Sequence, residues 1–133
     1  MAKYLLDSST VIDILRKNIS VRQNMYNAFA LGDILSICPV VYYEVVRGFK
    51  GDTNTNKYKV FLQLYQSWQI LPFDIKVADK AVEIYVQLHK GQVIEDNDIY
   101  TAAVAMANDC TLVTANTKHF GRIENLKIVN WRE

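Results

Sequence analysis

The apolar positions of the chain follow two alternating patterns. Short runs such as KYLLD (3–7) are typical of strands buried inside a sheet, whereas longer stretches repeat apolar residues every three or four positions, as amphipathic helices do. The predicted strands are residues 3–7, 34–38, 70–73, 111–114 and 126–131. The predicted helices are the segment after Ser8, residues 20–31, the segment that begins at Pro39, residues 55–68, 75–90 and 98–108, and a short turn or helix over 117–123.

Polar residues mark where these elements begin and end. Three hydroxyl residues, from Ser8 to Thr10, can cap the first helix, and Pro39 suits the first turn of a later one. The segment KGDTNTN (50–56) has the composition of a loop. Because no repeat, low-complexity segment or Pro/Gly-rich linker interrupts the chain, we expect a single domain over residues 1–133.

Strands that alternate with helices favour a parallel sheet covered by helices on both faces. We therefore predict an α/β fold, a three-layer α/β/α sandwich around a central parallel sheet of four to five strands. Right-handed crossovers would bring the carboxyl ends of the strands to one edge, where open α/β sheets bind ligands. Polar residues that directly follow the strands are therefore the candidate functional residues.

The composition narrows the class of protein but does not indicate a specific function. Half of the residues are hydrophobic and 22% are charged, which is an ordinary globular mixture, and the net charge of +1 leaves any nucleic-acid binding to a local basic patch. Cys38 and Cys110 are the two cysteines, and we expect both to be reduced and buried. Because no secretion signal and no apolar run of ~18 residues is present, we expect a cytoplasmic protein that does not enter a membrane.

Several carboxylates stand where the predicted strands end. Asp7 closes the first strand, and Glu44 lies in the helix after the second. Asp96 and Asp98 begin the helix that leads into the fourth strand, and Asn116 follows that strand. Acids held close together repel one another unless a cation lies between them, and oxygen ligands suit a hard divalent ion. Together these residues predict Mg²⁺ or Mn²⁺ chemistry on a phosphate ester.

Each of these residues also has an ordinary structural role. Asp7 could cap a helix, and Glu44 could form a surface ion pair with Arg47 three residues on. Acids in the segment IEDND would each stabilise a helix N-terminus by roughly 0.3–1 kcal/mol. Thr114 and Asn116 could be turn formers. Their joint placement at strand ends, more than any single residue, favours a metal site.

Several of these segments resemble the motifs of PIN-domain proteins. YLLDSSTVID resembles the family's opening, in which an apolar strand ends in Asp and a small hydroxyl residue follows. VVYYEVVRG resembles the second motif, a Glu in a helix with a small residue, here Gly48, four positions later. DNDIYTAAVAMANDCTLVTANTKHFGRIENLKIVNW resembles the third and fourth motifs in one block. The chain's size and motif order resemble the VapC-type ribonuclease toxins of prokaryotic toxin–antitoxin pairs.

The resemblance implies a PIN-like Mg²⁺- or Mn²⁺-dependent endoribonuclease that hydrolyses RNA as the toxin of a type II toxin–antitoxin system. Asp7, Glu44 and Asp98 match the core acids, as catalytic residues and metal ligands. Asp96 is a supporting or substitute ligand, and Glu95 is expected to be a solvated charge. The implied supporting residues are Ser8, whose hydroxyl would orient water, Thr114 and Asn116, and the candidate RNA contacts are Arg47, Lys50, Lys118 and Arg122.

Two positions depart from the family pattern. Ser9 stands where many relatives carry Asn, so a hydrogen bond there is lost or replaced. His119 stands where other members carry Asp or Glu, so Asn116 would have to offer a neutral oxygen. The missing fourth acid puts a tightly held second metal ion in doubt. The basic residues named above could equally be ordinary solvated charges.

The implied partners are RNA, a cognate antitoxin and a second copy of the chain. Either protein, or the chain itself, could cover the apolar surface of helix 55–68. A haloacid-dehalogenase-type phosphatase would need a second Asp two positions after Asp7, where Ser9 stands. A receiver domain would need paired acids at the first strand, and Glu44 in a helix fits it poorly. A catalytically weakened PIN-like module that binds RNA or protein remains the main alternative.

Overall fold

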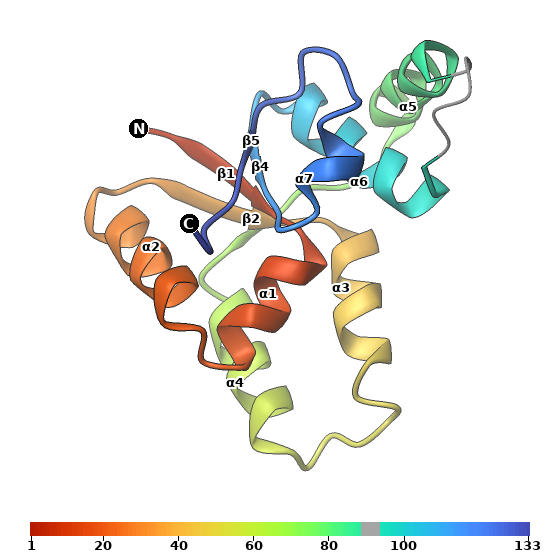
Figure 1. The fold of residues 1–133 in the computed structure, drawn as a ribbon. Helices are drawn as coiled ribbons and strands as arrows, with labels where there is room; N and C mark the ends of the chain where they lie inside the picture. The colour runs from red at the N-terminus through yellow and green to blue at the C-terminus, as the bar shows by residue number, and fades with distance from the viewer. Residues whose placement is uncertain (89–93) are drawn as a thin grey trace.

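The computed structural model describes residues 1–88 and 94–133. Five parallel strands form one sheet in the order β3-β2-β1-β4-β5 (Figure 1), which confirms the predicted α/β architecture. The strands are β1 (Lys3–Leu6), β2 (Ile34–Ile37), β3 (Gln69–Ile70), β4 (Thr111–Val113) and β5 (Ile128–Val129). The helices of the described residues are α1 (Ser8–Leu15), α2 (Ile19–Ala30), α3 (Pro39–Arg47), α4 (Asn56–Tyr65), α5 (Ile75–Gln87), α6 (Asp96–Ala107) and α7 (Thr117–Phe120).

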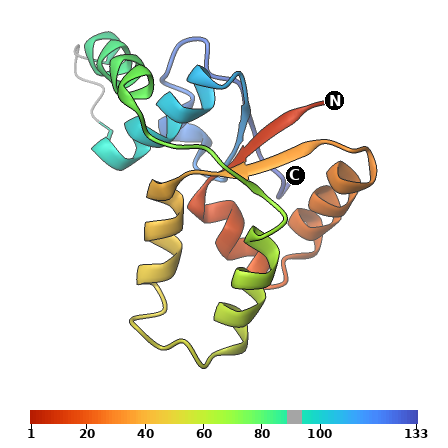
Figure 2. The same cartoon turned by 180° about the vertical axis from the view of Figure 1, so that it is seen from behind.

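The order of the strands determines where the helices lie. From β1 the chain moves through β2 to β3, and it then returns past β1 to form β4 and β5. Because crossovers between parallel strands are right-handed, this reversal puts α1–α4 on one face of the sheet and α5–α7 on the other (Figures 1 and 2). The reversal occurs between β1 and β4, so their carboxyl ends form the switch point at which α/β sheets bind ligands.

The central strand β1 is the most enclosed part of the sheet. Tyr4 lies opposite Leu35 of β2 and Thr111 of β4, and Leu5 and Leu6 are fully buried. Cys38 and Cys110 are free and buried, as expected. Among the described residues, no helix has the length and apolarity needed to cross a membrane.

Three strands end one residue before their predicted limits, and two are shorter by two residues or more. The predicted strand 70–73 is limited to Gln69–Ile70 because Pro72 has no N–H with which to continue the ladder, although the Leu71 N–H still donates to the Ile37 carbonyl at 2.9 Å. The predicted strand 126–131 is limited to Ile128–Val129. The chain then turns toward α2, whose Ser20 Oγ (2.8 Å) and Asn24 Nδ2 (3.0 Å) donate to the Trp131 carbonyl.

Helices α4, α5 and α6 differ most from their predicted limits, and α4 ends at Tyr65, three residues before the predicted end at 68. Helix α6 begins at Asp96, two residues before the predicted start, because Glu95 (φ −66°, ψ 150°) takes the extended N-cap position. Helix α5 ends at Gln87, and the last two positions of the predicted helix 75–90 lie outside the described residues. The start of α6 matters because it determines which of its acids point toward the edge of the sheet.

The aromatic face of α4 is covered within the chain, one of the possibilities that the sequence left open. Phe61 is fully buried, and its ring stacks on Tyr65 at a centroid distance of 5.4 Å and lies 5.8 Å from Tyr42. The exposed apolar surface instead lies elsewhere. On α2 it includes Ile19, Tyr26 and Phe29, and on α5 it includes Ile75, Val82, Tyr85 and Val86.

The C-terminal residues bind back to the first helix. Arg132 donates from Nε to Asp13 Oδ2 at 2.6 Å and from Nη2 to Asp13 Oδ1 at 3.0 Å. The Asp13 side chain is 8% exposed, whereas that of Arg132 is 50% exposed. Nearby, the rings of Trp131 and Tyr4 meet edge-on at 5.4 Å. The pair therefore ties α1 to the end of the sheet and satisfies a carboxylate that is largely shielded from water.

We expect Arg132→Ala to lower the free energy of unfolding by about 1–3 kcal/mol, because it leaves the buried carboxylate of Asp13 without its bidentate partner. Urea titration at neutral pH measures this loss. The matched control is Lys127→Ala, whose pair with Asp109 is exposed on both sides (69% and 86%), and its loss should stay below about 0.5 kcal/mol. Equal losses in the two variants would contradict the structural role of Arg132.

Candidate active site

Asp7 is held rigidly where β1 gives way to α1. Its N–H donates to the Val113 carbonyl at 2.9 Å, and its extended backbone takes the N-cap position of α1. Its Oδ2 accepts hydrogen bonds from Thr114 Oγ1 at 2.8 Å and from Ser9 Oγ at 3.3 Å. Burial raises the pKa of Asp7, and these hydrogen bonds, with one from the Ser8 backbone, oppose the rise.

Hydroxyl groups extend this contact across the switch point. The Ala115 N–H donates to Ser9 Oγ at 3.1 Å, and the Asn116 N–H donates to Thr114 Oγ1 at 3.0 Å. Ser9 and Thr114 therefore join the start of α1 to the segment after β4, over 105 residues of sequence. Ser9 therefore contributes hydrogen bonds at this position, a role that the sequence pattern did not assign to it. Its only signal was a hydroxyl two residues after the strand-closing Asp.

Glu44 of α3 and Asp98 of α6 share an electrostatic environment with Asp7. The pKa of Glu44 is raised by burial and then by the charges of Asp7 and Asp98, while Arg47 and a hydrogen bond with the Ser8 side chain oppose the rise. The side chain of Glu44 is only 15% exposed. The charges of three carboxylates from three different elements therefore act on one another at the carboxyl edge of the sheet.

The carboxyl group of Asp98 has a strongly raised pKa. Burial raises its pKa to about 6, the charges of Asp7 and Glu95 contribute, and His119 opposes the rise. A carboxylate that favours its protonated form at mildly acidic pH lacks full compensation by positive charge. A bound cation would supply that compensation.

The carboxylate oxygens are too far apart to coordinate one ion together. Within residues 1–88 and 94–133, no three His, Cys, Asp or Glu side chains lie close enough together to make a ready-made metal site. The donors present are oxygen atoms of Asp7, Glu44 and Asp98, with the amide of Asn116 nearby, and this chemistry fits a hard divalent cation.

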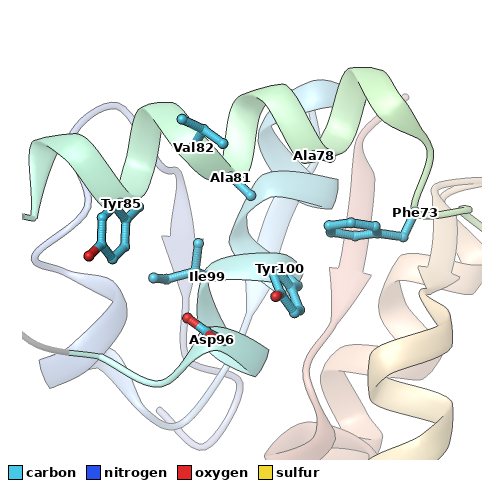
Figure 3. A pocket seen from close by; sticks show the side chains of 8 residues that line it. All are labelled: Phe73, Ala78, Ala81, Val82, Tyr85, Asp96, Ile99 and Tyr100. Atoms are coloured by element: carbon cyan, nitrogen blue, oxygen red, sulfur yellow. The ribbon is translucent and has the colours of Figure 1, made fainter.

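The acids at the start of α6 take different directions. Asp96 lines a pocket of about 320 Å³ between α5 and α6, beside Ile99, Tyr100 and Tyr85 (Figure 3). It is not among the groups whose charge shifts the pKa of Asp98. Glu95, expected to be only a solvated charge, is exposed but does raise the pKa of Asp98. The structure therefore places Asp98 toward the carboxylate cluster and Asp96 toward the α5–α6 pocket.

His119 lies beside the cluster rather than away from it. Its Nδ1 is 3.1 Å from the amide nitrogen Nδ2 of Asn116, and its charge counteracts the raised pKa of Asp98. The contact uses the nitrogen end of the Asn116 amide. The carbonyl oxygen of that amide is consequently the end that could face a cation.

The basic residues that the sequence singled out differ in their distance from this edge. Arg47 lies 4.0 Å from a carboxylate oxygen of Glu44 and 5.1 Å above the ring of Tyr43. Lys50 lies in the exposed loop after α3, and Lys118 is exposed on α7. Arg122 follows α7, and its carbonyl accepts a hydrogen bond from the Gln87 side chain at 3.0 Å. Of these residues, Arg47 makes the closest contact that the structure records with the cluster.

Comparison with known proteins identifies the family of the chain. A family model described as PIN domain matches residues 4–126. The chain is similar to Ribonuclease VapC2 of Rickettsia felis (31% identical, covering 96% of this chain and 97% of the relative). It is also similar to Ribonuclease VapC1 of Methanocaldococcus jannaschii (30% identical, covering 92% and 82%).

A solved structure gives the same fold. The crystal structure of VapBC2 from Rickettsia felis, bound to a DNA fragment from their promoter, contains a chain that superimposes with a TM-score of 0.85. The two chains are 28% identical, and the match covers 97% of this chain and 98% of the other. Nearly the whole length of the chain therefore takes part in the likeness.

The raised pKa of Asp98 predicts a pH-dependent effect of its removal. Because the folded pKa exceeds the ordinary value of 3.8, ionised Asp98 destabilises the fold fully above pH ~6, and the cost disappears as the pH falls toward 4. Without added metal, Asp98→Asn should therefore raise the free energy of unfolding by about 1 kcal/mol at pH 7.5, reduced from the full shift because the side chain is partly solvated.

Thermal or urea unfolding in EDTA at pH 7.5 and pH 4.5 tests this effect. The control Asp96→Asn removes an acid from the same helix N-terminus and should leave stability unchanged or slightly lower at pH 7.5. A destabilised Asp98→Asn protein at pH 7.5 would contradict the interpretation of unrelieved repulsion.

Proposed function

Since the chain belongs to the PIN domain family, we propose that it is a divalent-metal-dependent endoribonuclease that hydrolyses RNA phosphodiester bonds. The observation that carries the proposal is the convergence of Asp7, Glu44 and Asp98, from three elements, at the switch point of the sheet. The relatives named Ribonuclease VapC support the choice of RNA as substrate. On that basis the activity belongs in the cytoplasm, as the toxin of a type II toxin–antitoxin pair.

The metal site would combine one carboxylate that is held in place with two that would change orientation. Asp7 is the fixed ligand, because its carboxylate is held by Thr114 and Ser9. Glu44 and Asp98 would turn inward to complete the site, and Asp96 is kept only as a supporting ligand. Mg²⁺ or Mn²⁺, when bound, would neutralise the carboxylates, polarise the phosphodiester and lower the pKa of an attacking water.

The chain's own side chains would handle the proton and the phosphate. Glu44 and Asp98 have raised pKa values, which suits a group that accepts the proton of the attacking water near neutral pH. The Ser8 side chain, through its hydrogen bond with Glu44, would orient that carboxylate and the water beside it. Arg47, 4.0 Å from Glu44, would hold an RNA phosphate next to the cluster, and Lys50, Lys118 and Arg122 are further candidates.

Protein partners would account for the exposed apolar faces. The similar chain from Rickettsia felis was crystallised in a VapBC2 complex bound to promoter DNA. We propose that this chain likewise binds a cognate antitoxin and forms a homodimer. The apolar side chains exposed on α2, such as Tyr26 and Phe29, and on α5, such as Val82 and Val86, are the surfaces available for these contacts.

A second function rests on one specific observation. His119 occupies the position where other PIN proteins carry the fourth acid, and it lies beside Asp98 and Asn116. A positive or neutral group there, in place of a carboxylate, would weaken metal binding. The alternative is therefore a catalytically weakened PIN-like module that binds RNA or protein without cutting.

We expect Asp7→Asn and Asp98→Asn to reduce RNA cleavage by at least about 100-fold without loss of fold, because each removes a ligand and a charge from the metal site. Cleavage of total RNA with Mn²⁺ or with EDTA, with mapped cut sites and circular dichroism of each variant, tests this. Cleavage should require the metal. Asp96→Asn is the control and should lose less than about tenfold. If both core variants cut at the wild-type rate, the assignment of the metal site is wrong.

Expression of the wild-type chain in a bacterial host should arrest growth, because a free endoribonuclease depletes cellular RNA. Asp7→Asn, Asp98→Asn or co-expression of the cognate antitoxin should restore growth. The measurement is colony formation after induction, with immunoblots showing equal protein levels. Normal growth of several hosts that express the wild-type chain would favour the weakened binding module instead.

A further inference from the structure

We propose that a cavity between α1, α3 and α4 is a nucleotide subsite of the active site. It would take one nucleotide of single-stranded RNA next to the scissile phosphodiester, with the base against the apolar walls and the backbone phosphate at Arg16 and Lys57. The inference rests on the proposed RNA substrate and specifies where part of that substrate binds.

The cavity has the size and lining for a single base. Its volume is about 230 Å³, below the roughly 300–1,000 Å³ of pockets that enclose drug-sized ligands. Ile12 and Leu15 of α1 form one wall, and Val45 of α3 and Phe49 form another. The Phe49 ring is itself braced edge-on by Tyr58 at 5.3 Å. Flat bases bind to such apolar and aromatic surfaces with little regard to sequence.

Glu44 connects this cavity to the carboxylate cluster. Its side chain lines the cavity, and its carboxylate responds to the charges of Asp7 and Asp98. A nucleotide in the cavity would therefore have its neighbouring phosphodiester within reach of the proposed metal site. The α5–α6 pocket in Figure 3 is lined by none of Asp7, Glu44 and Asp98.

Two cations line the cavity and are available to a phosphate. Arg16 follows the end of α1, and Lys57 lies in the first turn of α4; both are exposed. In the part of the chain that the structure describes, neither has an ion-pair partner. A lysine in the first turn of a helix opposes the helix dipole, so Lys57 does not help α4 to form. The same dipole adds to Lys57 in attracting an anion.

These charges favour RNA over a protein segment. A nucleotide combines a flat apolar base with an adjacent phosphate, which matches an apolar wall with two cations at its edge. A peptide would need apolar and acidic side chains at matching positions to satisfy the same surface. The cavity also shares Glu44 with the site at which the RNA would be cut.

The first test measures binding of a fluorescent 12-nucleotide single-stranded RNA of mixed sequence to the full chain in EDTA. We expect Arg16→Ala and Lys57→Ala each to reduce the slope of log K against log salt by about 0.7, the value for one phosphate contact to a single strand. Lys59→Ala removes the same charge from the same helix outside the cavity, and it should leave the slope unchanged.

The second test concerns the base. A series of 12-mers, each with one abasic nucleotide, should show one position at which loss of the base weakens binding to the wild-type chain by about tenfold. Ile12→Trp, which fills the cavity, should remove the difference between that RNA and the intact one. Circular dichroism of each variant confirms its fold, and the two surface variants Arg16→Ala and Lys57→Ala do not depend on core packing.

Unchanged salt slopes in both Arg16→Ala and Lys57→Ala would overturn the subsite and leave the cavity to a protein segment. The outcome is separable from the proposed function because binding in EDTA requires no cleavage. Reduced slopes in a chain that never cuts RNA would support the subsite and refute the ribonuclease. Metal-dependent cleavage with unchanged KM and unchanged salt slopes in both variants would support the ribonuclease and refute the subsite.

Discussion

The hydrogen bonds between the carboxylate of Asp7 and the hydroxyls of Thr114 and Ser9 are the contact on which the rest of the site depends. They close the switch point between β1 and β4, where the two faces of helices separate, and they hold a buried acid in one orientation. A buried carboxylate without such partners would be costly to the fold. With them, it becomes a fixed point around which Glu44 and Asp98 can assemble.

The same arrangement holds negatively charged carboxylates close enough to repel one another. Burial and mutual repulsion raise the pKa of Glu44 and Asp98, and the positive charges nearby, Arg47 and His119, offset only part of the effect. Repulsion of this kind disfavours the fold when all three acids are ionised, and the proposed cation would relieve it. The charge of His119 opposes the raised pKa of Asp98.

Sequence patterns predicted the fold because its signals are local. Apolar runs and helical periodicity located nearly every element, and the errors lie at element ends, where Pro72 and the contacts of the Trp131 carbonyl stop pairing early. Among the three acids of the site, only Asp7 stands directly at a strand end. Glu44 and Asp98 lie in helices, and the resemblance to the family motifs singled them out from the other acids. The sequence did not show which way the Asp96 side chain points. Residues two positions apart on a helix, such as Asp96 and Asp98, are rotated by about 200° about its axis, so they cannot face the same site equally.

By itself, the sequence determined which segments form strands and helices, that the strands are parallel, and that acids gather at their carboxyl ends, because each of these follows from neighbouring residues and chain topology. Only the tertiary structure decided that Ser9 meets Thr114, that His119 lies beside Asn116 and Asp98, and that Arg16 and Lys57 line a cavity bordered by Glu44. These contacts depend on how distant elements pack, and packing distances are not encoded in any local pattern.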